Sequence, residues 1–368
     1  MNVLHVISDE NIGGAGILLL NLLSCMNDPS INNVVAIPEA SLLRGRLEAM
    51  NIPTLPLTYP CNRISASSIR ELCRHIQDRN VDIVHANAAL AARIAGRFCG
   101  IRIIHTRHCC FPPSGILRFP AVRALGGVFN RLLSDRAIAT ANEARKNLEE
   151  LGFPKNRIDV IINGSKEVRG VDACELEALR RKLKLSQTDF IVGICARLEP
   201  YKGHKTFLES VRLCKTLSPS TSFRFLIIGD GSLRQELVSF AQTLGIEDQV
   251  IFTGFVSDPA PFYRLMRVNV NCSCGTETSC LALSEGMSAS LPMIASDYGG
   301  NRAMIGEGLA GITVPVNDPR ALAQAICHIA ENPELEKKMR NASRKRFEEY
   351  YTAERMTEQV RQVYYSVL

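Results

Sequence analysis

Short apolar segments alternate with longer amphipathic stretches along most of this 368-residue chain. Such alternation is typical of parallel sheets whose strands are joined by helices. We therefore expect two α/β domains, each built on a parallel sheet. The expected strands form two sets, the first at 3–7, 34–37, 83–85, 102–106, 137–140 and 160–162, and the second at 191–196, 223–228, 250–253, 268–272, 293–295 and 312–314.

The boundary between the two sets lies in a polar, charged stretch at residues 166–188. We expect this stretch to be a linker between a first domain at 1–165 and a second at 189–348. A chain of 368 residues with 46% hydrophobic composition is long enough to bury a separate core in each domain.

Two glutamates eight residues apart, Glu277 and Glu285, follow the expected strand at 268–272. Thr and Ser residues around Glu277 predict that it lies at a helix N-terminus. On such a helix Glu285 would lie roughly 12 Å further along, close to the distance from the sugar to the ribose in a nucleotide-diphosphate sugar. The two carboxylates could then hold hydroxyls at both ends, while the helix N-terminus favours a diphosphate. A capping acid and a solvated helix acid are the alternative.

Two cations, Arg197 and Lys202, follow the expected strand at 191–196. We expect both at the carboxyl edge of a parallel sheet, where ligands bind, and two fixed cations there suit a leaving diphosphate. A structural ion pair with Glu199 or a neighbour is the alternative. The chain contains no Asp-x-Asp pair, so a metal-held diphosphate has little support.

Taken in order, these motifs resemble those of the retaining glycosyltransferase family 4, and the resemblance covers most of the chain. It implies the GT-B fold, two facing Rossmann-like domains with an active-site cleft between them, and a last helix at 349–368 that crosses back onto the first domain. The segments that carry it are 13–16 (GGAG), 83–87 (IVHAN), 105–108 (HTRH), 160–164 (VIING), 197–203, 228–231, 252–255, 277–285 and 292–301.

The resemblance also implies a role for each matching residue. Arg197 and Lys202 would bind and neutralise the diphosphate. Glu285 would hold the ribose hydroxyls, and Glu277 would contact the hexose and help to orient it. His108 would line the reaction centre.

Two glycine-rich segments complete the implied site. Gly14 and Gly16, in a loop after the first strand, would let the backbone approach the donor and acceptor closely. Gly300 and Asn301 would belong to a loop near the phosphates.

The chain departs from the family pattern at positions near the expected sugar pocket. Thr278 and Ser279 replace the Gly-Phe that commonly follows the first glutamate, and Arg302 and Ala303 stand where a glutamate or similar residue is usual. Ser165 replaces a common acidic residue. These differences leave the reaction class intact but do not indicate which sugar is moved.

Most of the net charge of +6 is N-terminal, because residues 1–165 carry 18 basic and 13 acidic side chains, an excess of five. The excess is concentrated between Arg93 and Arg136, where eight arginines accompany a single acid, Asp135. This stretch contains no recognisable nucleic-acid-binding module, so we expect no nucleic acid as a partner.

Within this stretch, Arg118, Arg123 and Arg131 are interleaved with apolar side chains. Such a segment can lie on an anionic membrane surface, with apolar groups in the interface and guanidinium groups among the headgroups. A solvated helix packed on the first domain is the alternative.

No apolar run approaches the roughly 18 residues that span a bilayer, and the N-terminus lacks the basic start of a signal peptide. Thirteen cysteines then argue for reduced thiols. We expect a cytoplasmic protein, held at the inner face of the cell membrane if the basic segment binds lipid. A metal cluster of Cys272, Cys274 and Cys280 is disfavoured, because Cys-x-Cys lacks the paired spacing of a zinc site.

These observations predict a metal-independent, retaining hexosyltransferase with no cofactor, retention being implied by the resemblance. It would move a sugar from a nucleotide-diphosphate donor, with a UDP-sugar favoured, to a hydroxyl of a saccharide or lipid-linked saccharide in cell-surface polysaccharide synthesis. One alternative is a nucleotide-sugar hydrolase or epimerase on the same fold. The other is a catalytically silent partner subunit that binds sugar nucleotides.

Overall fold

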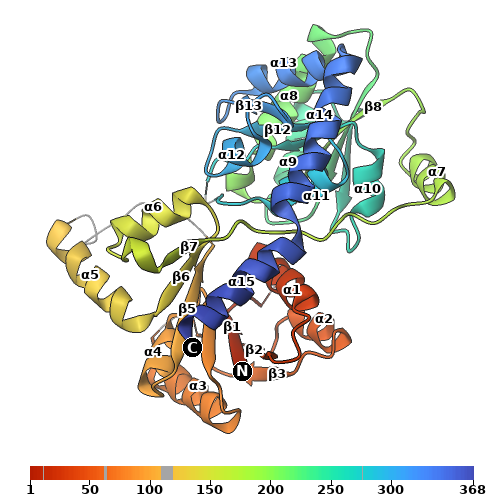
Figure 1. Ribbon diagram of the computed structural model, residues 1–368. Helices are drawn as coiled ribbons and strands as arrows, with labels where there is room; N and C mark the ends of the chain where they lie inside the picture. The colour runs from red at the N-terminus through yellow and green to blue at the C-terminus, as the bar shows by residue number, and fades with distance from the viewer. Residues whose placement is uncertain (11, 62–63, 109–118, 276) are drawn as a thin grey trace. The chain divides into compact units, whose positions relative to one another are not determined.

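The computed structural model describes residues 1–368 except 11, 62–63, 109–118 and 276 (Figure 1). The chain divides into two compact units. The first consists of Met1–Ser165 together with Ala353–Leu368, and the second of Lys166–Thr352.

The first unit is built on a seven-stranded sheet with the order β3-β2-β1-β4-β5-β6-β7, and every adjacent pair of strands is parallel. The sequence analysis missed one strand, β3, which contains Pro56 and lies at the edge of the sheet, where a missing N–H is tolerated. The strands are β1 (Asn2–Ile7), β2 (Asn32–Pro38), β3 (Thr54–Leu57), β4 (Ile83–Asn87), β5 (Arg102–Arg107), β6 (Arg136–Ala139) and β7 (Ile158–Val160).

Helices cover both faces of this sheet, because alternate residues of each strand point to opposite sides. Leu4 and Val6 of β1 pack with α3 and α4, whereas Ile7 packs with α1 and α2. The helices of the unit are α1 (Gly14–Cys25), α2 (Leu43–Ala49), α3 (Ala66–Asp78), α4 (Leu90–Phe98), α5 (Pro120–Leu133), α6 (Asn142–Glu150) and α15 (Ala353–Val367).

The last helix, α15, packs against α1 within the first unit. Its Tyr364 side chain is fully buried, and the Tyr364 hydroxyl lies 2.7 Å from Nδ1 of the buried His85 on β4. The end of the chain therefore supplies part of the core of the unit that begins it.

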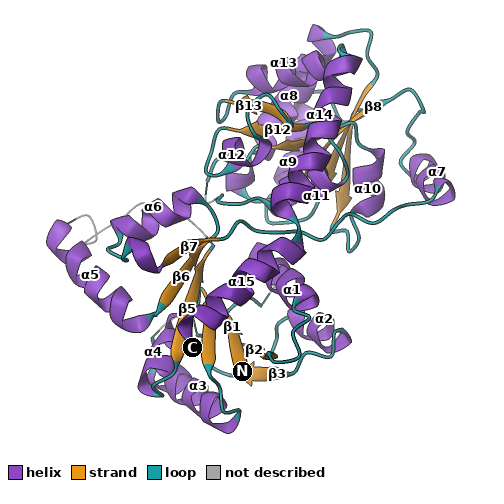
Figure 2. Ribbon diagram, viewed as in Figure 1, coloured by secondary structure: helices purple, strands orange, loops and turns teal. Residues whose placement is uncertain are grey.

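The second unit is built on a six-stranded parallel sheet with the order β10-β9-β8-β11-β12-β13. Figure 2 shows strands of this sheet in orange among the helices of the unit. All six strands lie within one residue of their expected positions. They are β8 (Phe190–Cys195), β9 (Phe223–Ile228), β10 (Val250–Gly254), β11 (Val268–Asn271), β12 (Met293–Ser296) and β13 (Gly311–Val314).

Helices pack on this second sheet around a core that includes Val192, Ile194, Phe207 and Phe225. The stretch at 166–188, expected as a linker, contains helix α7. The helices are α7 (Ala173–Lys182), α8 (His204–Leu217), α9 (Arg234–Thr243), α10 (Ala260–Leu265), α11 (Leu281–Ser288), α12 (Asn301–Ile305), α13 (Pro319–Ala330) and α14 (Pro333–Arg346). Both units thus have the helix-covered parallel sheet of a Rossmann-like domain, as the sequence predicts.

Candidate active site

The strand order of the second sheet reverses at β8, whose neighbours are β9 on one side and β11 on the other. Ligands of open α/β sheets bind beyond the carboxyl ends of the strands at such a switch point. The segment after β8 carries Arg197 and Lys202, and the segment after β11 carries Glu277. The strand order therefore brings together residues that are about eighty positions apart in the sequence.

A short 3₁₀ turn, Pro200–Lys202, holds Lys202 at this edge, and it ends at Gly203. The φ angle of Gly203 is +72°, and a Cβ there would lie 2.0 Å from the carbonyl oxygen of Cys272. Only glycine avoids both the left-handed strain and this clash. The turn consequently packs directly against the end of β11.

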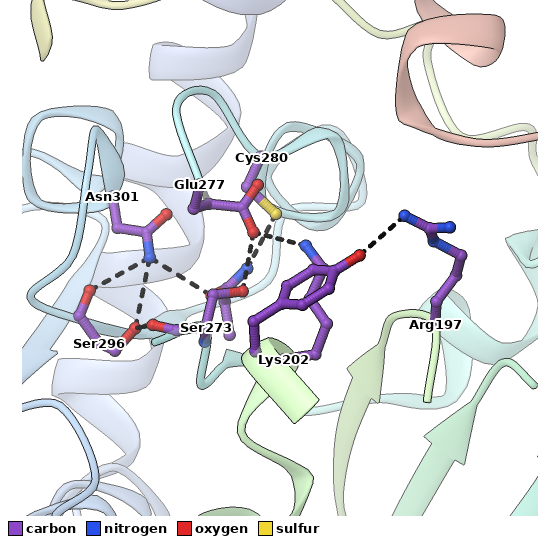
Figure 3. A network of polar contacts seen from close by, with 9 residues as sticks. Arg197, Lys202, Ser273, Glu277, Cys280, Ser296 and Asn301 are labelled. Carbon is purple, nitrogen blue, oxygen red and sulfur yellow. Dashed lines mark hydrogen bonds and ion pairs between the residues drawn. The ribbon is translucent and has the colours of Figure 1, made fainter. Parts of the chain in front are cut away.

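Lys202 and Glu277 form an ion pair, with Nζ 2.6 Å from Oε2 (Figure 3). The two side chains are only 18% and 11% exposed. The sequence analysis assigned these residues to different parts of the donor, whereas the structure joins them directly. Burial disfavours the charge on Lys202, but Glu277, with smaller effects from Cys280 and Tyr201, favours it, and the pKa of Lys202 is raised.

Arg197 lies at the same edge and is exposed. Its Nη2 donates a hydrogen bond to the Tyr201 hydroxyl across 2.9 Å, as Figure 3 shows. Among the described residues, no carboxylate pairs with it. An exposed guanidinium in this state is available to a phosphate.

A network of buried polar side chains holds Glu277 in place, and the sequence analysis did not predict this network. The Ser273 hydroxyl donates to Glu277 Oε2 across 2.7 Å, and the Ser273 amide donates to Asn271 Oδ1 across 2.9 Å. The Ser296 hydroxyl donates to the Ser273 carbonyl (Figure 3). A signal was present in the sequence, because Asn271 and Ser296 are polar residues at the ends of apolar strands.

Asn301 belongs to this supporting network. Its side chain is fully buried, and Nδ2 donates to the Ser296 carbonyl across 3.2 Å and to Asn271 Oδ1 across 3.3 Å. Its amide oxygen is buried without a partner among the described residues. The side chain of Asn301 therefore supports the ends of β11 and β12. The expectation that Gly300 and Asn301 belong to a loop near the phosphates stays a prediction.

The glycines next to Asn301 bring their loop against the glutamate loop. Gly299 has a φ of +55°, and a Cβ there would lie 2.0 Å from the Glu277 carbonyl oxygen. Gly300 is buried and forms the N-cap of α12. The loop at 299–301 thus holds the backbone of Glu277 in place.

Glu285 lies on α11, which begins at Leu281, four residues after Glu277. Glu277 is therefore in the loop and not at the helix N-terminus, and the expected spacing of both glutamates along one helix is wrong. Cys280, which caps α11, makes no side-chain capping bond. Thr278 and Ser279, which resembled caps in the sequence, are buried within the loop.

The Glu285 carboxylate is partly buried and accepts a hydrogen bond from the Tyr263 hydroxyl. Burial raises the pKa of Glu285 to about 7, and the Tyr263 hydrogen bond offsets only part of this shift. Glu285 therefore titrates near neutral pH, unlike an exposed glutamate.

In the first unit the strand order reverses between β1 and β4. The site residues predicted from the sequence in this unit are Gly14 and Gly16, which follow β1, and His108, which follows β5. His108 comes directly after β5, and its Nε2 lies 3.0 Å from Oδ1 of Asn87, the last residue of β4. Burial lowers the pKa of His108 to about 4, so its imidazole is neutral at physiological pH.

Gly14 and Gly16 lie in the first turn of α1 and not in a loop, because α1 begins at Gly14. A Cβ at Gly16 would come within 2.9 Å of the Leu43 side chain, so Gly16 lets α1 pack on α2. A Cβ at Gly14 would meet nothing within 4 Å. Of the two, only Gly14 has open space beside it for a ligand.

The described residues contain no group of three His, Cys, Asp or Glu side chains placed to hold a metal ion.

Arg302, which departs from the family pattern, pairs with Asp297 and Glu307.

Two Rossmann-like units with parallel sheets define a protein of the GT-B fold class. Comparisons with known proteins agree. The sequence pattern described as "Glycosyltransferase Family 4" matches residues 12–166, and that of "Glycosyl transferases group 1" matches residues 176–346. The chain belongs to this family of glycosyltransferases.

Individual relatives match over most of their length. The EpsD protein of Bacillus subtilis, named as a glycosyltransferase, is 31% identical over 309 residues, 78% of either chain. An Escherichia coli UDP-Gal:α-D-GlcNAc-diphosphoundecaprenol α-1,3-galactosyltransferase is 25% identical over 320 residues, covering 84% of this chain and 81% of its own. Among solved structures, Anabaena HepE in complex with UDP matches the fold with a TM-score of 0.86 at 19% identity over the full length of both chains.

Proposed function

We propose that the protein is a retaining hexosyltransferase that moves a sugar from a UDP-sugar to a hydroxyl of a saccharide or lipid-linked saccharide. The observation that carries this proposal is the pairing of Lys202 with Glu277, together with the exposed Arg197, at the switch point of the second sheet. Cations there suit a diphosphate and a carboxylate suits sugar hydroxyls, so one edge offers partners for both parts of a nucleotide sugar.

In the proposed mechanism, Arg197 and Lys202 stabilise the negative charge that develops on the departing diphosphate. The departing phosphate oxygen accepts the proton of the acceptor hydroxyl on the same face of the sugar, so retention needs no separate nucleophile. Glu277 orients the hexose and Glu285 holds the ribose hydroxyls. His108, as a neutral imidazole, contacts the reacting sugar. Because the two cations neutralise the diphosphate, we propose that transfer requires no metal.

The relatives favour particular substrates. The Escherichia coli relative is named for UDP-Gal and a diphosphoundecaprenol-linked acceptor, and HepE is bound to UDP. These names support a UDP-sugar donor and a lipid-linked acceptor, and therefore a role in the synthesis of cell-surface polysaccharide.

A lipid-linked acceptor also fits a group of exposed apolar side chains on and next to α4 and α5 of the first unit, which we call the α4–α5 patch. The side chains of Phe98, Phe119 and Leu132 are each more than 60% exposed, and Arg131, which precedes Leu132 in the sequence, is exposed as well. Arg97 and Arg102 lie nearby and share Asp135. The remaining members of the patch are Val128 and Phe129.

We propose that the α4–α5 patch rests on the anionic inner face of the cell membrane, since exposed apolar groups together with arginines suit a headgroup interface. Of the arginines named from the sequence, Arg118 and the side chain of Arg123 lie outside the described residues, and Arg131 remains. No helix in the described part of the chain is long and apolar enough to cross a bilayer.

Calorimetric titration of UDP, GDP and ADP in metal-free buffer tests the donor site. We expect UDP to bind most tightly and Lys202→Ala to weaken its binding. Absence of binding by any of the three would contradict the proposal and favour a silent partner subunit. Release of free sugar from the donor without an acceptor would favour a hydrolase.

A further inference from the structure

The Lys202–Glu277 ion pair links two groups that the proposed function, on which this inference rests, assigns to different parts of the donor. Lys202 is assigned to bind the diphosphate and Glu277 to bind the sugar, yet the two side chains already form an ion pair across 2.6 Å. A nucleoside diphosphate that reaches Lys202 therefore meets a cation that already has a carboxylate partner.

The carboxylate also lies where a bound diphosphate would be repelled by it. Any phosphate oxygen in contact with Lys202 Nζ lies within a few ångströms of Glu277 Oε2, because both oxygens share one ammonium group. Both side chains are largely shielded from water, so the repulsion is screened less than it would be at the surface.

Glu277 cannot easily move aside to relieve this repulsion. The Ser273 hydroxyl holds Oε2 across 2.7 Å, and the backbone of Glu277 packs against Gly299. The Ser273 backbone is itself fixed by Asn271 and by Ser296. The negative charge is therefore a fixed part of the site.

The second carboxylate oxygen, Oε1, makes no hydrogen bond within the described part of the chain, so it is available to a donor such as a sugar hydroxyl. An intact nucleotide sugar can supply that hydroxyl, and a hydrogen bond to a charged group offsets part of the repulsion. The free nucleoside diphosphate has no hydroxyl at this position.

We propose that the Glu277 carboxylate makes the site select the intact nucleotide sugar over the free nucleoside diphosphate. It repels the diphosphate, and it accepts a hydrogen bond from a sugar hydroxyl. Removal of the sugar then leaves an uncompensated carboxylate beside the diphosphate. Glu277 thus promotes release of the nucleotide product.

Calorimetric titration of metal-free UDP into the full chain tests this proposal with the near-isosteric variant Glu277→Gln. We expect UDP to bind about tenfold or more tightly to the variant than to the wild type, although loss of a site residue ordinarily weakens binding. With UDP-glucose and UDP-galactose as probes, the ratio of donor affinity to UDP affinity should fall in the variant for whichever sugar nucleotide binds the wild type.

Two controls separate the charge of Glu277 from other effects. Glu236→Gln removes the carboxylate of an exposed pair with Lys205 in the same unit, across 2.5 Å, and should leave UDP affinity within about twofold of the wild type. Ser273→Ala removes one restraint on Glu277 but keeps its charge, and should tighten UDP binding less than Glu277→Gln does. Thermal unfolding of each variant checks that it is folded.

Unchanged or weaker UDP binding by a folded Glu277→Gln variant would overturn the inference, as would equal tightening in Ser273→Ala. Failure of the proposed function gives a different result. In that case the wild type would not bind UDP, or Lys202→Ala would bind it as well as the wild type does.

Discussion

The hydroxyl of Tyr263, a fully buried side chain, donates a hydrogen bond to the Glu285 carboxylate across 2.9 Å. This bond favours the ionised carboxylate, but burial has the larger effect and raises the pKa of Glu285 to about 7. Burying Glu285, the residue that we assign to the ribose, therefore costs folding free energy, and this cost increases as the pH rises.

The variant Glu285→Gln should stabilise the protein more at pH 8 than at pH 5. Since the folded-state pKa lies above the unfolded value, the contribution of Glu285 to stability is present at low pH and is lost as pH rises through about 7. Glutamine carries no such charge. The gain in free energy of unfolding, measured with denaturant, should be on the order of 2 kcal/mol larger at pH 8 than at pH 5.

The exposed variant Glu247→Gln serves as its control and should show little change at either pH. An equal gain for Glu285→Gln at both values would mean that Glu285 does not titrate in this range.

The variant Lys202→Ala should lose roughly 3 kcal/mol of transition-state stabilisation, the amount typical of one preorganised electrostatic group. It removes a cation that we assign to the departing diphosphate. Steady-state kinetics of sugar transfer would detect the loss mainly in kcat. Near-normal turnover in a folded variant would remove Lys202 from its assigned role.

The double variant Phe98→Ser, Leu132→Ser should reduce binding to vesicles that contain anionic lipid, because it removes two of the most exposed apolar side chains of the α4–α5 patch. Co-sedimentation with vesicles measures the effect. Leu309→Ser, which removes an exposed apolar side chain of the second unit, is the matched control. If both proteins sediment equally, the patch is not a membrane surface.

The variant Gly203→Ala should destabilise the second unit by roughly 3 kcal/mol or more, because it combines left-handed strain with a backbone clash against Cys272. Gly245→Ala isolates the strain, since Gly245 has a φ of +63° but nothing within 4 Å of its Cβ position. Its cost should be about 1–2 kcal/mol. Similar unfolding curves for the two variants would show that the turn at Lys202 is not tightly packed.

The sequence predicted the strands well, because buried parallel strands are short apolar runs that stand out from their surroundings. It failed at the edge strand β3, where Pro56 interrupts the pattern. It also placed the start of the glutamate helix too early, since Thr278 and Ser279 have the residue types of helix caps but lie buried in the loop.

The contact between Lys202 and Glu277 could not be predicted from spacing. It depends on β11 pairing directly with β8, while the next strand in the chain, β9, lies on the other side. The supporting role of Asn301 was hidden for a similar reason, because its partners Asn271 and Ser296 end two different strands. Residue types identified the chemistry, whereas the order of the strands determined which groups meet.

Helix α15 has a consequence for how the protein is made. The second unit is a single continuous segment, so all of it is available as soon as residue 352 has left the ribosome. The first unit cannot be completed before α15 is synthesised, because Tyr364 of α15 lies in its core and contacts His85. The domain that begins the chain is thus the last to be completed, and a ribosome that stalls before residue 353 releases a finished second domain attached to an unfinished first one.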